Sequence, residues 1–305
     1  MSLFAGNELP TMTDSEYRML SEFVRKHCGL HFGPESRFLL EKRVARRVRD
    51  LELTSFSAYH YLLRSGASSA GELPELIDEL TTNETYFFRE LGQLRGLIHE
   101  VVPAVRLERP DQPVSIWSAG CSSGEEPFTV AMLALEAGLQ PGRDLRIYAS
   151  DISRRVLRKA RQGVYRESSF RETDPVLREK YFSEKEGTSR ISDALKQCVD
   201  FVHVNLMDRS KLALLGKMDV VLCRNVIIYF DVESKRQVIR TFHEKLRPGG
   251  HLMLGHSESL INLSSDFHLR HLRSDLVYQR PLPGVSPQHP WDAIVDATLA
   301  EGAAS

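Results

Sequence analysis

The stretch Ser115–Pro127, SIWSAGCSSGEEP, indicates the fold of the larger part of the chain. An apolar, strand-like run passes into a turn rich in Gly and Ser and then into a helical pattern. This arrangement lets a ligand approach backbone amides at the carboxyl edge of a parallel sheet. The spacing is not the G-x-G-x-x-G of dinucleotide-binding turns, and Glu125 and Glu126 occupy the helix start where a phosphate would bind. The turn therefore favours a cationic or zwitterionic ligand, although a plain strand-to-helix turn with two favourable acids explains the same residues.

From Gln112 onward, short apolar runs alternate with helical patterns, which predicts a parallel sheet built from βαβ units. We expect strands at Val114–Trp117, Leu145–Ser150, Val199–Val204, Met218–Cys223, His251–Gly255 and Ser274–Gln279. We expect helices at Glu125–Ala137, Ser153–Gln162, Leu212–Gly216 and Val232–Lys245. Pro248-Gly249-Gly250 is typical of a turn between a helix and the strand that follows it.

The N-terminal part has a different pattern. Residues from about Thr13 to Arg64 predict helices, with a first amphipathic stretch at Ser15–His27 and a second helix opened by Pro34. The polar segment from Glu72 to about Arg95 is typical of a connection between two folding units. Tyr181–Asp200 fits no βαβ unit, so we interpret it as a small insertion.

The composition excludes several classes of protein. The chain has 305 residues, is 42% hydrophobic and carries a formal net charge of −1, which predicts a soluble globular protein and gives no support to bulk polyanion binding. Its four cysteines form no C-x-x-C pair, and its histidines show no metal-binding spacing, so we expect no metal site, no disulfide framework and a reducing cytoplasmic location. The N-terminus does not resemble a signal peptide, and no apolar run approaches the roughly eighteen residues that cross a bilayer.

Polar residues follow two further expected strands. Asp151 ends the second strand, where a carboxylate can accept both hydroxyls of a ribose or can cap the next helix. The apolar strand Val221–Cys223 passes into Arg224-Asn225 and a turn that carries Tyr229, and polar groups at such a position are costly unless they are satisfied. A packed Tyr229 and a salt-bridged Arg224 are the alternative to a ligand site. The glycine-rich turn and Asp151 together indicate nucleoside binding without phosphate recognition.

A set of short strings points to one family. They are Asn83–Glu90 (NETYFFRE), Gly124–Pro127 (GEEP), Asp151, Asn205-Leu206, Cys223–Asp231 (CRNVIIYFD), Leu246–Gly250 (LRPGG) and Gly255–Glu258 (GHSE). Together they closely resemble the chemotaxis receptor glutamate methyltransferases of the CheR type, over about residues 13–281. The resemblance implies an α/β fold with a Rossmann-like S-adenosylmethionine-dependent methyltransferase sheet, a small all-α N-terminal domain and a small β-subdomain insertion.

The resemblance also implies an activity and a site. The activity is methyl transfer from S-adenosylmethionine to glutamate carboxylates of methyl-accepting receptors, which gives glutamyl methyl esters and S-adenosylhomocysteine. Asp151 would bind the ribose, Glu125 would lie near the methionyl end, and Arg89 and Tyr229 would face the transferring methyl and the incoming carboxylate. By the same carry-over the cofactor site would be lined by Asn83, Thr85, Arg89, Glu125, Asp151, Asn205, Leu206, Arg224 and Asn225.

The stretch Arg37–Arg49 contains six basic residues and one acid. At about 100° per residue, one helix face collects Lys42, Arg43, Arg46 and Arg49, and the opposite face collects Leu40, Val44, Val48 and Leu51. We expect the apolar face to pack and the basic face to be free. The resemblance implies that Arg43, Arg46 and Arg49 contact the acidic methylation helices of a receptor. A merely solvated face is the alternative, and no interleaved aromatic residues support nucleic-acid binding.

The expected domain organisation has four parts. They are an N-terminal helical receptor-recognition domain at 11–75, a linker contributing to the cofactor site at 76–92, a methyltransferase catalytic domain at 93–283 with a β-insertion at about 180–200, and a flexible tail at 284–305. Family members that bind a C-terminal receptor pentapeptide carry a glycine-rich loop in this insertion, whereas Ser183–Ile191 holds one glycine. We therefore expect independence from the pentapeptide. We also expect a monomer that does not insert into a membrane.

Two other functions remain open at this point. The first is a CheR-like module that binds S-adenosylmethionine or docks on receptors without turnover. The second is a small-molecule methyltransferase, for which the basic N-terminal helix would be unnecessary.

Overall fold

The computed structural model describes residues 11–284, except the side chains of residues 66–70, and the chain divides into two compact units. Unit 1 runs to Thr82 and includes the short segment Tyr229–Asp231. Unit 2 begins at Asn83 and contains the remaining residues. The expected tail lies outside the described residues, apart from its first residue, Gly284.

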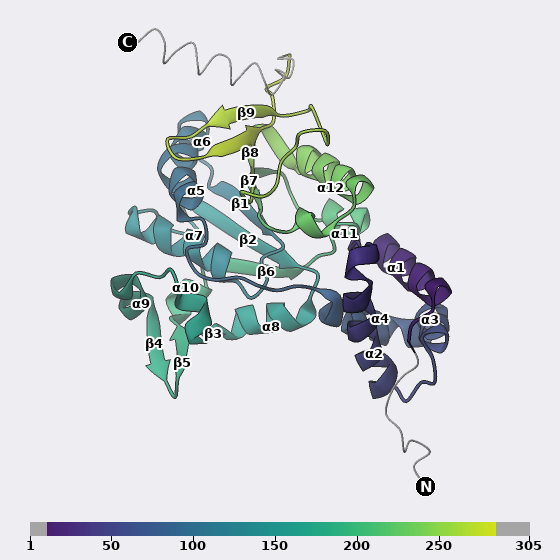
Figure 1. Cartoon of the computed structure of the whole chain (residues 1–305). Coiled ribbons are helices and arrows are strands. Elements are labelled where there is room, and N and C mark those ends of the chain that lie inside the picture. The colour runs from purple at the N-terminus through teal and green to yellow at the C-terminus, as the bar shows by residue number, and fades with distance from the viewer. Residues whose placement is uncertain (1–10, 285–305) are drawn as a thin grey trace. The chain divides into compact units, whose positions relative to one another are not determined.

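Unit 1 contains the helices α1 (Asp14–Cys28), α2 (Arg37–Asp50), α3 (Phe56–Arg64) and α4 (Gly66–Leu80), with a 3-10 turn at Pro34–Ser36 (Figure 1). Helix α1 begins where the side chains and backbones of Thr13 and Glu16 form a capping box, and it ends where Gly29 adopts a φ of 77°. The predicted helices after Thr13 and Pro34 are confirmed.

The apolar stripe of α2 is buried as predicted, because Leu40, Val44 and Val48 all lie in the interior of unit 1. Helix α4 differs from the expectation, since it runs through Glu72 and Pro74 to Leu80. The first part of the segment expected to connect the two units is therefore helical, and residues 81–86 have no regular secondary structure.

Unit 2 is built around a seven-stranded sheet. In spatial order its strands are β6 (Val199–His203), β2 (Leu145–Asp151), β1 (Val114–Ala119), β7 (Met218–Cys223), β8 (Leu246–Leu254), β10 (Leu276–Gln279) and β9 (His268–His271). The first five are parallel, and β10 pairs antiparallel with both β8 and β9. The parallel α/β sheet predicted from the sequence is confirmed, while β9 was not predicted.

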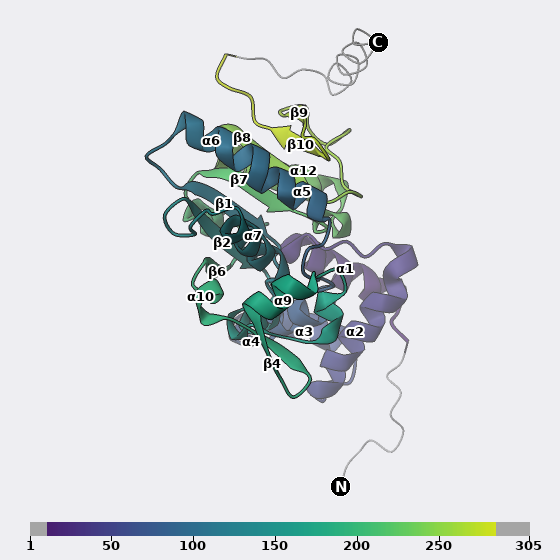
Figure 2. The ribbon, with the colours of Figure 1, turned by 90° about the vertical axis from the view of Figure 1, so that its left-hand side faces the viewer.

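Helices cover this sheet on two sides. Helices α5 (Leu91–Gly96), α6 (Val102–Glu108) and α7 (Glu125–Glu136) lie on one side and α12 (Val232–Lys245) on the other (Figures 1 and 2). A π-helical turn at Leu97–Val101 joins α5 to α6, and α8 (Arg154–Gln162) follows β2. Shorter helices are α9 (Pro175–Tyr181), α10 (Asp193–Lys196) and α11 (Arg209–Ala213).

Two local predictions in unit 2 were wrong. The helix expected at Leu212–Gly216 is α11, which starts earlier because the Asp208 side chain caps its first N–H groups. Pro248–Gly250 does not form a turn before a strand but lies inside β8, where the pairing with β7 shifts its register. Gly249 has a φ of 80°, so this strand tolerates the irregularity.

A small three-stranded sheet has the order β3 (Val164–Tyr165), β5 (Thr188–Ile191) and β4 (Phe182–Lys185). Strands β4 and β5 fall in the expected insertion, whereas β3 precedes it. The sheet packs on an aromatic cluster, in which the ring of Phe87 lies 4.8–5.2 Å from the rings of Tyr165, Phe170 and Phe182. The NETYFFRE string is thereby attached to the small sheet.

Candidate functional site

The carboxyl ends of the parallel strands β6, β2, β1 and β7 meet at one edge of the sheet. Ala119 at the end of β1 pairs with Ser150, and Ser118 pairs with Leu222 of β7. The glycine-rich turn, Asp151 and Arg224-Asn225 therefore emerge side by side, as the sequence predicted. This edge is the candidate site.

The glycine-rich turn needs its glycines. Gly120 and Gly124 have φ values of 84° and 93°, in the left-handed region that side chains disfavour. A Cβ atom at Gly120 would lie 2.5 Å from Cγ2 of Val226, so the turn after β1 packs directly on the residue that follows Asn225. The N–H groups of Gly120 and Cys121 both donate to the carbonyl of Ser150.

Asp151 links this turn to the start of α8. Its Oδ2 accepts the N–H of Ser122 at 2.8 Å, and its Oδ1 accepts the N–H of Ser153 at 2.8 Å. The cap of α8 is Ser153, whose side chain accepts the N–H of Val156. The N-cap residue of α8 is therefore Ser153, two residues after Asp151.

Glu125 lies at the start of α7 and is 2% exposed. Its carboxylate accepts the hydroxyl groups of Ser123 at 2.8 Å and Ser169 at 3.1 Å. Burial raises the pKa of Glu125, and the two hydroxyl donors partly oppose that rise. Because Ser169 precedes Phe170 of the aromatic cluster, the segment around the small sheet reaches the candidate site.

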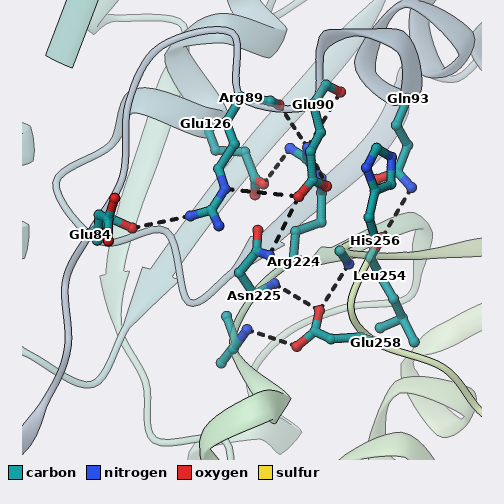
Figure 3. A network of polar contacts seen from close by, with 12 residues as sticks. Glu84, Arg89, Glu90, Gln93, Glu126, Arg224, Asn225, Leu254, His256 and Glu258 are labelled. Carbon is teal, nitrogen blue, oxygen red and sulfur yellow. Dashed lines mark hydrogen bonds and ion pairs between the residues drawn. The ribbon is translucent and has the colours of Figure 1, made fainter. Parts of the chain in front are cut away.

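Arg224 lies at the centre of a polar network at the end of β7 (Figure 3). Its guanidinium donates to Glu126 Oε2 at 2.9 Å, to the carbonyl of Arg89 at 2.7 Å and to Glu90 Oε2 at 3.1 Å. The side chain is only 2% exposed. Arg224 thus ties the NETYFFRE string to the sheet edge, which is the salt-bridge role considered as an alternative to ligand contact.

Arg89 is placed differently. Its guanidinium donates to the carbonyl of Glu84 at 3.3 Å, lies 3.9 Å from Glu90 and remains 30% exposed (Figure 3). The backbone on either side is unusual, because Phe88 and Glu90 have φ values of 63° and 51°. Each such residue costs on the order of 1–3 kcal/mol, and this strain is characteristic of functional sites.

The other predicted cofactor residues of unit 2 also lie near this edge. Asn225 has a φ of 59° and donates its side-chain amide to Glu90 at 3.4 Å. The carbonyl of Asn83 accepts the hydroxyl of Ser122, which places the start of the linker beside the glycine-rich turn. Thr85 is half-buried in the same segment.

Asn205 and Leu206 follow β6, the strand beyond β2. The Oδ1 atom of Asn205 accepts the N–H of Met207 at 2.9 Å, and Leu206 is buried.

The two predicted catalytic residues fall in different units. Arg89 belongs to unit 2, whereas Tyr229 belongs to unit 1, where its carbonyl accepts the N–H of His31 at 2.9 Å. The Tyr229 side chain is half-buried.

The basic face of α2 is only partly as expected. Arg43 donates to the carbonyl of Leu80, and Arg46 forms an ion pair with Glu79 at 2.8 Å. The expectation that the whole face is free was wrong, because the end of α4 supplies acceptors to these two residues. Arg49 is exposed, and in residues 11–284 the structure gives it no hydrogen bond or ion pair.

Three acidic residues of the edge were not predicted as site residues. Glu90 and Glu126 hold Arg224, and Glu258 accepts four backbone N–H groups. Each belongs to one of the strings that carry the family resemblance, and this membership was the sequence signal that could have indicated them as site residues. Their partners come from distant segments, so spacing alone could not assign them.

Carboxylates outnumber cations at this edge, which suits a ligand that carries positive charge. Five acidic residues lie here, Glu90, Glu125, Glu126, Asp151 and Glu258, and the arginines Arg89 and Arg224 form ion pairs with Glu90 and Glu126. Among residues 11–284, no group of three metal-ligating side chains is arranged to hold a metal ion.

Comparisons with known proteins agree with this geometry. The family model "CheR methyltransferase, SAM binding domain" matches residues 83–275, and "CheR methyltransferase, all-alpha domain" matches residues 15–81. Chemotaxis protein methyltransferase 2 of Vibrio cholerae is 39% identical over 284 residues, which cover 92% of this chain and 98% of that protein. The chemotaxis protein methyltransferase of Escherichia coli is 37% identical over 273 residues, covering 88% of this chain and 92% of that protein.

Proposed function

The chain belongs to the CheR methyltransferase family, and on that basis we propose that it methylates glutamate side chains of chemotaxis-type receptors with S-adenosylmethionine as the methyl donor. The enzyme class is protein-glutamate O-methyltransferase. The observation that carries the proposal is the carboxylate-rich edge of the sheet, where a glycine-rich turn and Asp151 lie side by side.

The residues of this edge fit S-adenosylmethionine. The bound cofactor supplies a methyl group on a positively charged sulfonium. Asp151 would accept the ribose hydroxyls, and Glu125 would lie near the ammonium of the methionyl end. The excess of carboxylates disfavours phosphate-bearing nucleotides, so it selects for a cationic nucleoside.

The substrate needs little activation. A glutamate side chain has an unperturbed pKa of about 4.3, so at neutral pH it is already an anionic nucleophile. The protein mainly has to hold three atoms in line, and such positioning can contribute several kcal/mol. This explains why the proposal assigns no general base.

Arg89 is proposed to orient the incoming carboxylate. Its guanidinium lies 3.9 Å from the Glu90 carboxylate and is 30% exposed. It can therefore still bind an incoming anion. An Arg89→Gln variant should lower kcat/KM for receptor, measured at a cofactor concentration that saturates the variant. Unchanged kcat/KM would refute the role.

Unit 1 is proposed to bind the acidic methylation helices of the receptor, mainly through α2. Arg49 is the residue best placed for this, because Arg43 and Arg46 already bond to the end of α4. Independence from a receptor pentapeptide is also proposed, since β4 and β5 are joined by the two-residue turn Glu186-Gly187 rather than by a long glycine-rich loop. Micromolar binding of such a peptide in calorimetry would refute the second point.

A cytoplasmic location is proposed because Cys28, Cys121, Cys198 and Cys223 are all unpaired. In the part of the chain from residue 11 to 284, no helix has both the length and the apolar character of a membrane span. A monomeric state stays a prediction, which light scattering of the purified enzyme tests.

The test of the proposed function is incubation with methyl-labelled cofactor and receptor-containing membranes. Incorporated label that base releases as methanol supports glutamyl esters. Cofactor binding without any label transfer, across several receptors, would favour a binding module over an enzyme.

A further inference from the structure

Glu258, which follows β8, is a half-buried carboxylate with an unusual set of partners. Its Oε2 accepts the N–H of Asn225 at 2.7 Å and that of Gly255 at 2.8 Å. Its Oε1 accepts the N–H of Val226 at 2.9 Å and that of Ile228 at 3.2 Å. One side chain therefore satisfies four backbone donors from two chain segments.

Three of these donors belong to the loop that leaves β7. This loop turns sharply at Asn225, whose φ of 59° points successive N–H groups toward one side. Hydrogen bonds to an ionised acceptor are roughly twice as strong as neutral ones. The conformation of the loop thus depends on a carboxylate that lies about thirty residues further along the chain.

Gly255 gives a second, independent observation about the same place. A Cβ atom there would lie 2.7 Å from the side-chain nitrogen of Asn225 and 2.9 Å from its backbone nitrogen. Nothing larger than glycine fits without moving Asn225. The end of β8 therefore fixes Asn225 in two ways, by the absence of a side chain at Gly255 and by the carboxylate of Glu258.

We infer that Glu258 is a positioning residue of the methyltransferase, which holds Asn225 and the loop that leaves β7 in the conformation that cofactor binding and methyl transfer require. This inference rests on the proposed function, because Asn225 is one of its candidate cofactor-binding residues. Glu258 itself touches neither reactant in this account. It acts only through backbone bonds.

Glu258→Gln tests the inference with an isosteric change. The variant keeps one acceptor oxygen and places an amide NH2 group against two N–H donors, so the loop must move. We expect S-adenosylhomocysteine to bind about tenfold more weakly, and kcat at saturating cofactor and receptor to fall by about tenfold or more, as misplacement by about 1 Å can cost about a hundredfold. A merely structural role would lower the melting temperature but leave both values unchanged in the folded protein.

Two further variants keep the test decisive. Gly255→Ala leaves Glu258 intact and displaces Asn225 from the other side, so it should lower affinity and kcat in the same direction. If Glu258→Gln does not fold, Gly255→Ala tests the inference alone. Glu100→Gln is the matched control, because Glu100 also accepts a backbone N–H, from Arg273 at 3.2 Å, and is not part of the Glu258 network.

Calorimetry with S-adenosylhomocysteine needs no methyl acceptor, so its result stands even if no receptor is methylated. If the wild-type protein methylates no receptor, the proposed function fails, yet the loss of affinity in Glu258→Gln remains measurable. Wild-type affinity and wild-type kcat in both Glu258→Gln and Gly255→Ala would overturn the inference.

Discussion

At the scale of single residues, Asp151 both bonds to the backbone of the candidate site and is the proposed ligand of the ribose. Its carboxylate already accepts two N–H groups, and the proposed ribose contact would use its remaining lone pairs. Asp151→Asn keeps the shape but turns one acceptor into a donor that faces an N–H group. We expect the dissociation constant for S-adenosylhomocysteine, measured by calorimetry, to rise at least about tenfold, which corresponds to about 1.4 kcal/mol.

The matched control lies at the other end of the same strand. Asp144, just before β2, is also buried and accepts the N–H of Gln140 at 2.8 Å. Asp144→Asn should lower the melting temperature without changing the affinity for S-adenosylhomocysteine. Equal losses of affinity in the two variants would show that the Asp151 effect is general destabilisation.

The sequence indicated the strand ends and turns at which the candidate residues lie, but it did not indicate their hydrogen-bond partners, and their roles stay predictions. Gly120, Gly124 and Asp151 were predictable because their positions follow from strand ends and turn chemistry. The role of Glu258 was not, since its four donors come from residues 225–255 and only the folded chain brings them together. Arg224 was assigned to the cofactor from the resemblance, whereas the structure shows its guanidinium bonded to protein groups.

At the scale of elements, unit 1 depends on a buried polar cluster between α2, α3 and α4. Glu72 accepts hydrogen bonds from the Arg47 guanidinium at 2.7 and 2.9 Å and from the Tyr59 hydroxyl at 2.6 Å. Glu72→Ala would leave the largely buried Arg47 guanidinium with the exposed Asp50 as its remaining ion-pair partner, at 3.0 Å, and would remove the acceptor of the buried Tyr59 hydroxyl. The free energy of unfolding of unit 1 should therefore fall by about 3 kcal/mol in urea denaturation.

The pair of Glu79 with Arg46 offers the control on the same two helices. Arg46 is 59% exposed, so Glu79→Ala should cost no more than about 1 kcal/mol. If the two substitutions cost the same, the Glu72 cluster is not what holds these helices together.

His251 in strand β8 predicts that the free energy of unfolding depends on pH. Burial, with a smaller contribution from Arg270, lowers the pKa of His251 from 6.5 to about 4. The unfolded chain takes up this proton near pH 6.5 while the folded chain resists it, so this stability is present above pH 6.5 and is lost as the pH falls toward 4. The loss is at most about 3 kcal/mol.

His251→Phe should remove this contribution. Urea denaturation at pH 7 and at pH 5 should show a smaller fall in the free energy of unfolding for the variant than for the wild type. His271→Phe, the same change at an exposed histidine of β9, tests whether burial is the cause. Equal falls for His251→Phe and the wild type would contradict the assignment.

Elements with a strong periodic signal were predictable, and irregular ones were not. The parallel strands β1, β2 and β7 follow from apolar runs, and α2 follows from its two opposite faces. The irregular start of β8 was missed because Pro and Gly usually mark turns, while here a register shift against β7 accommodates them. The conformation of this part of β8 depends on pairing with a distant strand, which sequence periodicity does not encode.

At the scale of the whole molecule, a near-neutral net charge conceals a local excess of basic residues on α2. If this helix binds acidic receptor helices, association should weaken as salt screens the charges. Arg49→Glu should raise KM for receptor by about tenfold, with unchanged affinity for S-adenosylhomocysteine, and should reduce the dependence of KM on ionic strength.

Arg64→Glu is the control for total charge. Arg64 is an exposed residue at the end of α3, so its reversal changes the net charge by the same amount on another helix of unit 1. Its KM for receptor should stay close to that of the wild type. A similar rise in both variants would assign the effect to overall charge rather than to α2.

The proposed reaction at the carboxylate-rich edge of this sheet is the transfer of a methyl group to glutamate. The most direct measurement is peptide mapping by mass spectrometry of a receptor signalling fragment incubated with the enzyme and S-adenosylmethionine. We expect glutamate side chains to gain the mass of one methylene each, mild base to remove this mass, and Asp151→Asn to slow its appearance. Methylation of another side chain, or no methylation although the cofactor binds, would contradict the account.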